Sequence, residues 1–573
     1  MAEKIVYTLS AKCKDCYRCI RVCPVKAISF SGSQANVDNE KCIVCGTCIR
    51  ECPQGAKTFR NDVSNVEIML EESKENNSKT AVTLAPSFVC AFNGDEIKKI
   101  PSALKKLGFD YVAETAVGAY DTAIATARLS AKKNNKSEIC TACPAAVNYV
   151  TMYRKESTDS LINVVSPMIA HAKKIKKKLG ENAKIVFAGP CVAKKSEIHW
   201  ESVKGFVEYA LTFTELKELF ANNNIILSEL EDGFFDEEVP GKSRFFPLPG
   251  GLLKTASIEN DGLDRQTFHV NGFEDFRNAV DGIKSSDGTL IEPLFCDNGC
   301  INGPGISNDK NIFEKRKDII NYASQAKTSG ETPEVNIEDL EISFLPNYNV
   351  EHKQYSEEEI KKVLAKTSKF TKDDELNCGA CGYNTCRDKA AAVLDNMAEP
   401  EMCIPFMRKS AEVKADKIFE TSPNAIIITD DNFNVLSMNG AFKKMFLTSD
   451  ALVGKHISAL FDPSEFYALA SSKELMRSGV VSYDAYGVKC RQIVYFLEDD
   501  KHYIGIFINI TKTSRDKEKL NEIKKQTLLK AKELLEHQIE TAQKMALFLG
   551  ESTAKSEELL DQLLKISEND DDQ

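Results

Sequence analysis

Eight cysteines near the amino terminus have a spacing that suits iron–sulfur clusters. Two runs, "CKDCYRCIRVCP" and "CIVCGTCIRECP", each hold three cysteines at intervals of three and end in a Cys-Pro pair. In two-cluster iron–sulfur proteins the cysteine before proline ligates the other cluster. The runs therefore predict two 4Fe–4S clusters, one on Cys13, Cys16, Cys19 and Cys52 and the other on Cys42, Cys45, Cys48 and Cys23. The competing prediction, a zinc ribbon, needs paired CxxC units without a third cysteine.

Other cysteines are scattered along the chain in short motifs. They lie in "TACP" at 141–144, "GPCVAKKSE" at 189–197 and "LFCDNGCINGPG" at 294–305. Taken one by one, each could be a packed thiol, because free cysteine packs like a small hydrophobe. A denser group follows, with cysteines at 378, 381, 386 and 403. Four thiolates suit either a 4Fe–4S cluster or zinc, and the neighbouring cluster motifs favour iron.

Composition limits the function classes. The chain has 573 residues, which allows several domains, and its net charge of −11 argues against nucleic acid as a partner. No apolar run reaches the length of a membrane span, and the first residues lack a signal-peptide core. Nineteen cysteines grouped in tight sets favour metal ligation in a reducing compartment over disulfides. We therefore expect a cytoplasmic protein that does not bind membranes.

The patterning of the chain predicts a multidomain α/β protein that ends in a coiled helix. Strand-like "KIVFAGP" alternates with helical "AHAKKIKKKLG" and "FTELKELFANN", which indicates an α/β domain. Residues 66–80 are interpreted as a polar helix and linker. The predicted segments are a ferredoxin-like double-cluster domain at 1–62, the α/β domain at 78–365, a cysteine-rich module at 370–410, an α+β domain at 413–512 and a helical output segment at 513–573.

The carboxyl-terminal segment has a heptad pattern. With a and d positions counted from Leu528, nine of twelve such positions to Ile566 are apolar. This pattern favours a coiled coil, and hence a homodimer. A single amphipathic helix packed on its own domain is the alternative.

The three scattered motifs together, in this order, resemble the signature motifs of the iron–iron (FeFe) hydrogenases, whose patterns are close to TSCCP, MPCxxKKxE and MACxGGCxxGG. The resemblance spans about residues 80–310 and implies an H-cluster, a 4Fe–4S cubane joined to a two-iron subsite with CO and cyanide ligands. It implies that Cys143, Cys191, Cys296 and Cys300 are its ligands, with Cys300 bridging to the two-iron subsite. It further implies that Lys194 hydrogen-bonds a cyanide, that Glu197 closes the second motif, and that Ala85, Pro86 and Ser87 line the two-iron unit. Cys140, Cys90 and Cys490 have no ligand counterpart and are interpreted as packed thiols.

The motifs depart from the family pattern at positions that concern protons. Ala142 stands where fast members of the family have a second cysteine that passes protons to the site. The helix before the first motif, "AVGAYDTAIATARL", offers Asp121 but no glutamate. Gly189 and Leu294 replace two methionines. General acid–base groups contribute on the order of a hundred- to ten-thousand-fold in rate, so we expect slow turnover.

Downstream segments complete the prediction. "CGACGYNTCRDK" onward resembles small 4Fe–4S modules, and "IFETSPNAIIITDDNFNVLSMNGAFKKMF" resembles PAS domains. This order of domains resembles the sensory branch of the family. The resemblance implies a low-turnover oxidoreductase acting on dihydrogen and protons, with a ferredoxin-like carrier and a downstream phosphatase or kinase as partners. The alternative is a working ferredoxin-dependent hydrogenase whose PAS domain and tail serve dimerisation.

Overall fold

The structure, a computed structural model, describes residues 4–132, 136–257, 267–307, 309–325, 333–347, 350, 353–472 and 474–568. It divides into two compact units, Met1–Met407 and Arg408–Gln573, which are described separately below. The predicted α/β class is confirmed. None of the described helices is both long and apolar enough to cross a membrane.

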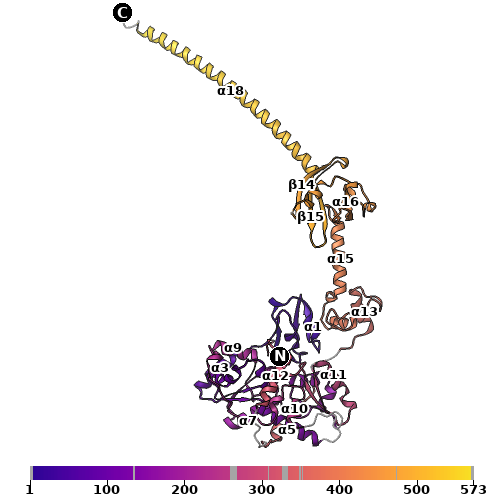
Figure 1. Ribbon diagram of the computed structural model, residues 1–573. Helices are drawn as coiled ribbons and strands as arrows, with labels where there is room; N and C mark the ends of the chain where they lie inside the picture. Colours follow the sequence, from indigo (N-terminus) through magenta and orange to yellow (C-terminus); the bar gives the residue numbers. More distant parts are fainter. Residues whose placement is uncertain are drawn as a thin grey trace. The chain divides into compact units, whose positions relative to one another are not determined.

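The amino-terminal part of the first unit is built from two small antiparallel strand pairs (Figure 1). Strand β1 (Val6–Thr8) pairs with β4 (Lys57–Phe59), and β2 (Ile28–Ser31) pairs with β3 (Gln34–Val37). Each cysteine run enters a short helix, α1 (Arg18–Val22) or α2 (Thr47–Arg50). This arrangement agrees with the duplication seen in the sequence.

Two parallel sheets form the framework of residues 78–342. The first has the strand order β6-β5-β8-β9 and the second the order β10-β11-β7. The strands are β5 (Thr80–Leu84), β6 (Tyr111–Glu114), β7 (Glu138–Ile139), β8 (Lys184–Gly189), β9 (Tyr209–Thr212), β10 (Thr267–Asn271) and β11 (Leu290–Leu294). Both β5 and β11 are buried along their whole length, as expected for parallel strands covered on both faces.

Helices cover these sheets. They are α4 (Glu96–Leu107), α5 (Ala116–Lys132), α6 (Pro144–Tyr153), α7 (Pro167–Leu179), α8 (Lys194–Glu197), α9 (Phe213–Asn222), α10 (Gly251–Thr255), α11 (Phe273–Gly282) and α12 (Ile312–Ser324). The helix predicted within 66–80 is α3 (Val63–Glu75), which is packed on the core, and a short connection leads from it to β5. Val66 and Leu70 of α3 are buried in the main core, because its apolar residues recur at helical spacing between the charged ones.

The cysteine-rich module packs against the amino-terminal part. Helix α13 (Glu357–Lys366) contacts α14 (Cys386–Leu394), which begins at a cysteine. Tyr383, Met397 and Met402 share a buried apolar cluster with Ile20 of α1. The two cysteine-rich regions are therefore neighbours in space although more than 350 residues separate Ile20 from Tyr383 in the chain.

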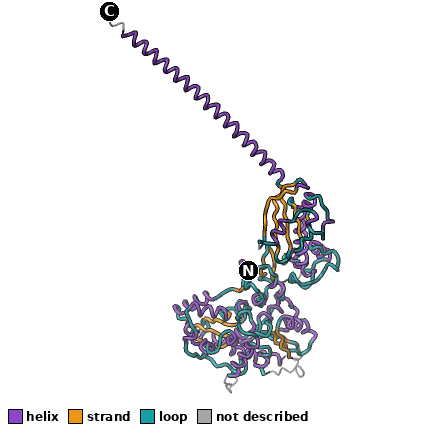
Figure 2. Tube along the Cα trace, turned by 45° about the horizontal axis from the view of Figure 1, so that its top comes forward, coloured by secondary structure: helices purple, strands orange, loops and turns teal. Residues whose placement is uncertain are grey.

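The second unit contains a five-stranded antiparallel sheet in the order β13-β12-β16-β15-β14, seen as the orange strands beneath the long helix in Figure 2. Its elements are β12 (Ala425–Thr429), β13 (Val435–Met438), α16 (Gly440–Met445), α17 (Ser464–Ala470), β14 (Met476–Tyr483), β15 (Val488–Leu497) and β16 (His502–Asn509). Phe442, Phe446 and Phe507 fill the core. Helix α15 (Ile404–Thr421) precedes the sheet, and α18 (Thr511–Glu568) follows it.

The predicted tail is helical throughout α18. Leu528, Leu535, Met545 and Leu559 of the heptad pattern are exposed by more than half. The side chains of Leu549, Ser552, Ser556, Leu563 and Ile566 lie outside what the structure describes. Pairing of this helix with a second copy stays a prediction.

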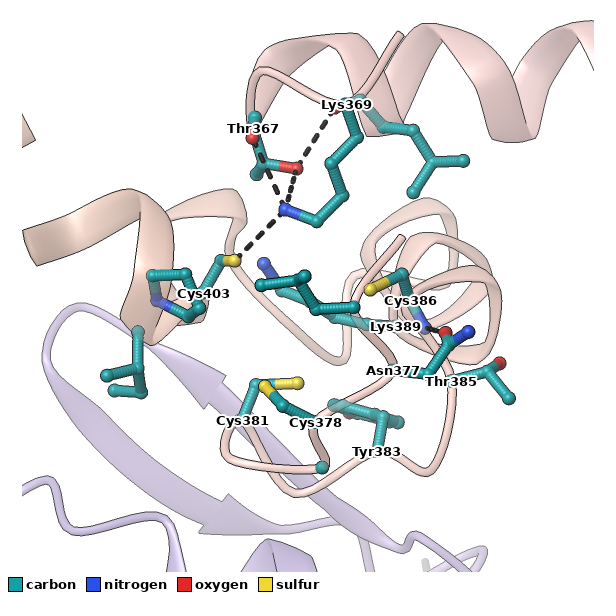
Figure 3. Close-up of a pocket in the computed structure, with 15 residues that line it drawn as sticks. Thr367, Lys369, Asn377, Cys378, Cys381, Tyr383, Thr385, Cys386, Lys389 and Cys403 are labelled. Carbon is teal, nitrogen blue, oxygen red and sulfur yellow. Dashed lines mark hydrogen bonds between the residues drawn. The ribbon is translucent and has the colours of Figure 1, made fainter. Parts of the chain in front are cut away.

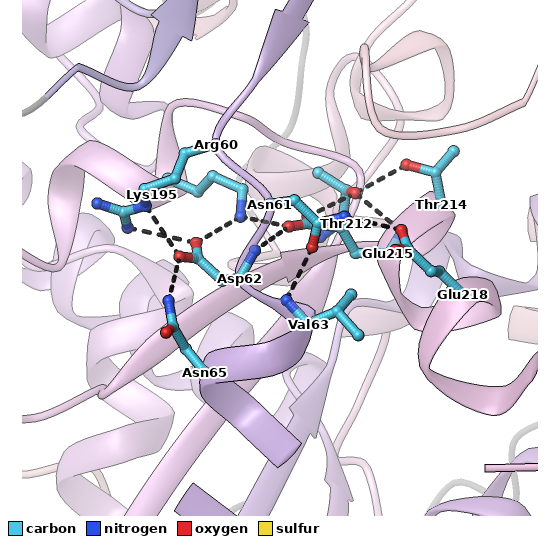
Figure 4. A network of polar contacts seen from close by, with 10 residues as sticks. All are labelled: Arg60, Asn61, Asp62, Val63, Asn65, Lys195, Thr212, Thr214, Glu215 and Glu218. Carbon is cyan, nitrogen blue, oxygen red and sulfur yellow. Dashed lines mark hydrogen bonds and ion pairs between the residues drawn. The ribbon is translucent and has the colours of Figure 1, made fainter. Parts of the chain in front are cut away.

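A buried ion network joins the amino-terminal part to the parallel sheets (Figure 4). Lys195 is fully buried, and its ammonium donates to Asp62 at 2.7 Å and to Glu215 at 2.8 Å. Asp62 precedes α3, while Glu215 closes a capping box with Thr212 at the start of α9. Both carboxylates are buried, so each needs a cation nearby: Lys195 compensates the charge of Glu215, and Asp62 is shared between Lys195 and Arg60, whose Nε lies 2.8 Å from Asp62 Oδ1.

Replacing Lys195 by methionine is expected to lower the free energy of unfolding by about 3–5 kcal/mol, because the buried Glu215 loses its paired cation and Asp62 is left with Arg60 alone. Lys204→Met is the matched control, since Lys204 is 65% exposed and lies 4.0 Å from Glu201. Urea unfolding of both variants checks this. If Lys195→Met lowers the free energy of unfolding by less than about 1 kcal/mol, the network does not stabilise the contact between the two parts.

Candidate functional site

The residues of the three scattered motifs all follow the carboxyl ends of parallel strands. Ala85 follows β5, Cys191 lies two residues after β8, and Cys296 lies two residues after β11. Cys143 lies four residues after β7 and immediately precedes α6. Parallel sheets characteristically bind ligands at this edge, where the strand order leaves a crevice. Here the carboxyl ends of strands from both sheets lie around the same crevice.

Of these residues, Ala85, Cys143 and Cys191 line a single cavity of about 90 Å³, called here the cysteine cavity. Its walls are largely apolar. It is lined by Ala85, Pro86, Ser87, Thr115, Ala119, Ala142, Cys143, Pro144, Pro167, Met168, Phe187, Pro190, Cys191, Lys194, Phe246, Pro247, Leu294 and Cys300. Cys296 is not one of the lining residues, but its thiol is close enough to those of Cys143, Cys191 and Cys300 to interact electrostatically with them.

Burial dominates the protonation of the four thiols. It raises the pKa of Cys143, Cys296 and Cys300, and it raises that of Cys191 to about 12. Interactions among the thiols also raise the pKa of Cys191, Cys296 and Cys300, because charging one thiol disfavours charging its neighbours. A bound metal centre reverses this cost, since metal coordination deprotonates a thiol outright. The donor set therefore fits an iron–sulfur centre.

Lys194 places one ammonium group at the wall of the cavity. Its Nζ donates to Ser166 Oγ at 2.7 Å and to Glu197 Oε2 at 2.6 Å, and both Lys194 and Glu197 are buried. An ammonium has three donors, so one N–H is left for a group inside the cavity. Glu197, placed by the single turn of α8, thus holds the lysine in position.

The turn after β5 contributes a polar group without a partner. Pro86–Cys90 form a 3-10 turn in which Ser87 is fully buried. The hydroxyl of Ser87 has no hydrogen-bond partner among the described residues, although it lines the cavity. A buried unpaired hydroxyl is costly, so this group also fits a polar cofactor in the cavity.

Two of the positions that depart from the family pattern, Ala142 and Leu294, line the cavity. Ala142 presents a methyl group to it, and Leu294 presents an isobutyl group. At Gly189 a Cβ atom would lie 2.3 Å from Phe187 Cζ, so the phenyl ring occupies the space of the missing methionine. Asp121 does not line the cavity. Its Oδ2 accepts from Lys174 at 3.3 Å, and burial raises its pKa.

A chain of polar side chains leads away from the cavity, and sequence reasoning missed it. Thr115 Oγ1, at the cavity wall, lies 2.7 Å from Thr83 Oγ1, which lies 2.7 Å from His171 Nδ1. His171 Nε2 lies 3.3 Å from Glu237 Oε2, whose side chain is 20% exposed. No spacing could reveal this, because the four residues come from different elements.

The eight amino-terminal cysteines fall into two groups. Cys48 interacts electrostatically with Cys23, Cys42 and Cys45, and these four are called the second cluster site. Cys19 interacts electrostatically with Cys13 and Cys16, and the assignment of Cys52 to the same set stays a prediction. These four cysteines, 13, 16, 19 and 52, are called the first cluster site.

The second cluster site abuts the loop that carries Cys296 and Cys300. Gly46, between Cys45 and Cys48, has φ +75° and lies so close to Pro304 that a Cβ atom would meet Pro304 Cγ at 2.5 Å. Arg50 of α2 donates to the carbonyl of Asn302 at 3.3 Å and pairs with Asp297 at 3.0 Å. These contacts place a predicted electron carrier beside the cysteine cavity.

The cysteine-rich module has its own small cavity of about 30 Å³ (Figure 3). Cys378, Cys381, Cys386 and Cys403 all line it, with Lys369 and Lys389 between them. Cys140, Cys90 and Cys490 are buried elsewhere, as predicted for packed thiols.

Comparisons with known proteins match four stretches of the chain. Residues 78–304 match the family "Iron only hydrogenase large subunit, C-terminal domain", and residues 5–53 match "4Fe-4S dicluster domain". Residues 374–405 match "Putative Fe-S cluster", and residues 423–519 match "PAS domain". The chain therefore combines a hydrogenase-type H-cluster domain with iron–sulfur and PAS domains, which confirms the predicted resemblance. No curated protein sequence matches.

FeFe hydrogenases and PAS domains are among the solved structures that the chain matches. A structure on oxygen inactivation of an FeFe hydrogenase is 16% identical, covers 50% of this chain and 99% of its own, and has a TM-score of 0.40. A variant of the FeFe hydrogenase HydA1 from Chlamydomonas reinhardtii is 17% identical, with coverages of 50% and 99% and a TM-score of 0.39. The PAS domain of an HTR-like protein from Haloarcula marismortui is 16% identical, with coverages of 18% and 95% and a TM-score of 0.16.

One buried carboxyl group near these elements links stability to pH. Glu292 of β11 accepts hydrogen bonds from the amides of Leu252 at 3.0 Å and Leu253 at 3.2 Å, at the start of α10. Burial raises the pKa of its carboxyl to about 7, and the amide hydrogen bonds offset this shift only in part. The folded state therefore binds more protons than the unfolded state between the unfolded pKa of about 4.3 and the folded value.

The free energy of unfolding should accordingly fall as the pH rises through this window. From pH 6 to pH 8 the wild type is expected to lose about 1 kcal/mol more than Glu292→Gln does, because the variant has no proton to release there. Urea unfolding at the two pH values measures the difference, with the exposed Glu341→Gln as the control that should follow the wild type. Equal pH dependence of all three proteins would contradict the assignment.

Proposed function

We propose that this chain is a sensory hydrogenase that reacts slowly and reversibly with dihydrogen and passes the redox state through 4Fe–4S clusters to the PAS domain and α18. The observation that supports this proposal most directly is the methyl group of Ala142 at the wall of the cysteine cavity. Among the described lining residues none is Asp or Glu, and the described thiols are those assigned to the cofactor. Proton exchange with the cavity is therefore the slow step.

The residues of the cavity suit an H-cluster. Cys143, Cys191, Cys296 and Cys300 would hold this cofactor. The N–H of Lys194 left free by Ser166 and Glu197 bonds a ligand of the two-iron subsite, and the turn Ala85–Ser87 lines its other side. When bound, this cofactor supplies the reversible cleavage of dihydrogen into protons and electrons. The apolar walls exclude bulk water from it.

Protons move through this chain's own side chains. A proton taken up at Glu237 passes to His171 Nε2, and the Nδ1–H of His171 passes a proton to Thr83 Oγ1. Thr83 passes its proton to Thr115 Oγ1, which releases one to the cavity; the short contacts along this chain support the route. A threonine hydroxyl is a much weaker acid than a thiol, so this relay is slower than one that starts at a cysteine.

Electrons leave by the second cluster site, which abuts the Cys296–Cys300 loop. The first cluster site includes the exposed Cys16 and suits exchange with a ferredoxin-like carrier. The recipient of the signal is a phosphatase or kinase on a separate chain, and the exposed apolar residues of α18 support a homodimer.

Ala142→Cys is expected to raise the turnover of the matured protein at least tenfold, because a thiol restores an acid at the cavity wall. Ala145→Cys is the matched control, since Ala145 is buried on α6 but does not line the cavity. Dihydrogen oxidation with a dye acceptor measures the rates. If the wild type already turns over as fast as bulk hydrogenases and Ala142→Cys changes nothing, the protein is a working hydrogenase whose tail serves dimerisation.

Thr83→Val and Thr115→Val are expected to slow turnover at least tenfold, because each removes one hydroxyl from the relay and keeps the shape. The infrared bands of bound CO and cyanide should keep their positions while their response to a pH jump slows in the same proportion. Thr122→Val is the control, since its hydroxyl bonds the carbonyl of Val165 instead. Unchanged rates in both relay variants would exclude this route.

A further inference from the structure

Two buried lysines, Lys369 and Lys389, face the four cysteines of the cysteine-rich module (Figure 3). Lys369 is 9% exposed and Lys389 is 6% exposed. Lys369 Nζ donates to Cys403 Sγ at 3.2 Å and lies within 3.4 Å of the carbonyl and the hydroxyl of Thr367. Lys389 Nζ donates to the carbonyl of Pro400 at 2.6 Å and interacts electrostatically with Cys403 and Cys381. None of the described residues that line this cavity is Asp or Glu.

The thiols of the two amino-terminal cluster sites accept hydrogen bonds from backbone amides instead. A buried lysine, Lys57, interacts electrostatically with some of them, but its ammonium donates to Thr8 Oγ1 and to the carbonyl of Ala35. Cys23 accepts from the amide of Ala27 at 3.3 Å, Cys42 from Val44 at 3.4 Å and Cys52 from Ala56 at 3.2 Å. Hydrogen bonds to cluster sulfurs and the local net charge set the reduction potential of an iron–sulfur cluster. Because reduction adds a negative charge, a buried ammonium bonded to a ligand sulfur favours the reduced state more than an amide does.

The module lies against the second cluster site. Gly382, with φ +94°, approaches α1 so closely that a Cβ atom would meet Ile20 Cγ2 at 2.9 Å and the amide nitrogen of Arg21 at 3.1 Å. Lys26 Nζ donates to the carbonyl of Gly382 at 2.8 Å, and Arg21 donates to the carbonyl of Ala380 at 3.1 Å. Tyr383 interacts electrostatically with both Cys381 and Cys23. An electron at the second cluster site thus has two neighbouring sites to which it can be transferred, the first cluster site and the module.

We propose that the module holds a 4Fe–4S cluster that stores one electron, because Lys369 and Lys389 give it the highest reduction potential among the clusters of residues 1–407. The electron comes from the cluster on Cys23, Cys42, Cys45 and Cys48. The module cluster passes from the 2+ to the 1+ state while the donor returns from 1+ to 2+, and no bond breaks. The role of this electron as a signal rests on the proposed function, but the potential itself does not.

The position of Cys403 gives the stored charge a structural consequence. Cys403 directly precedes α15, and the amide of Met407 donates to its carbonyl at 2.8 Å in the first turn of that helix. Helix α15 ends at Thr421, four residues before β12 of the PAS domain begins. A charge gained at Cys403 is therefore gained at the start of the segment that leads into the PAS domain.

Redox titration of the full chain, reconstituted with iron and sulfide and monitored by electron paramagnetic resonance with dithionite as reductant, tests the proposal. In the wild type one cluster signal should appear at a higher potential than all others, and Cys386→Ala should remove or alter that signal alone. Lys369→Met should lower the reduced-to-oxidised ratio of that cluster at a fixed potential about tenfold, which is about 59 mV for one electron. Lys369→Gln, which keeps an N–H donor without the charge, should shift it less.

Lys366→Met is the control, because Lys366 is an exposed residue at the end of α13. The proposal is overturned if the module binds zinc, if its cluster is not the first to be reduced, or if Lys369→Met with full iron content leaves its potential unchanged. Lys389→Met provides a second variant should Lys369→Met lose iron, and no shift in it would count equally against the proposal. Since dithionite replaces dihydrogen, the outcome is independent of whether the H-cluster functions.

Discussion

Four thiols buried at the carboxyl ends of two parallel sheets are the constraint on which the first unit depends. Each of these thiols is costly to ionise in its apolar surroundings, and three of them also repel one another once charged. A cationic iron centre is what makes such a group of thiolates favourable. The cavity is therefore built for a metal cofactor, and the surrounding contacts either hold its walls or connect it to the rest of the chain.

Two adjacent lysines make these two kinds of contact, one at the cavity wall and one between the parts of the first unit. Lys194 points its ammonium to the cavity wall, with Glu197 and Ser166 fixing its direction. Lys195, the next residue, binds Asp62 and Glu215 and so ties α8 to the amino-terminal part. One short helix thus couples the placement of a cofactor-binding group to the joint between electron-carrying and catalytic parts. Removing either lysine takes the paired cation from a buried carboxylate, Glu197 in one case and Glu215 in the other.

Much of this could be predicted from the sequence, because covalent spacing is enough for local ligand sets. The intervals of three residues around Cys13 and Cys42 indicated clusters without any fold, and alternating strand and helix patterns indicated the α/β domain. Long-range features were not predictable in this way. The relay of Thr115, Thr83 and His171, and the close approach of Gly382 to α1, depend on which elements become neighbours. Helix α3 was predicted as a polar helix, and its packing on the core was missed because its charged residues obscured the apolar face.

The central claim is that the cysteine cavity holds a complete H-cluster that responds to dihydrogen but turns it over slowly. Infrared spectroscopy of the matured full chain, titrated with dihydrogen, tests this most directly. The account predicts bands of bound CO and cyanide that shift reversibly with the dihydrogen pressure while the steady-state rate stays far below that of bulk enzymes. A matured protein with no such bands, or with bands that ignore dihydrogen, would contradict it.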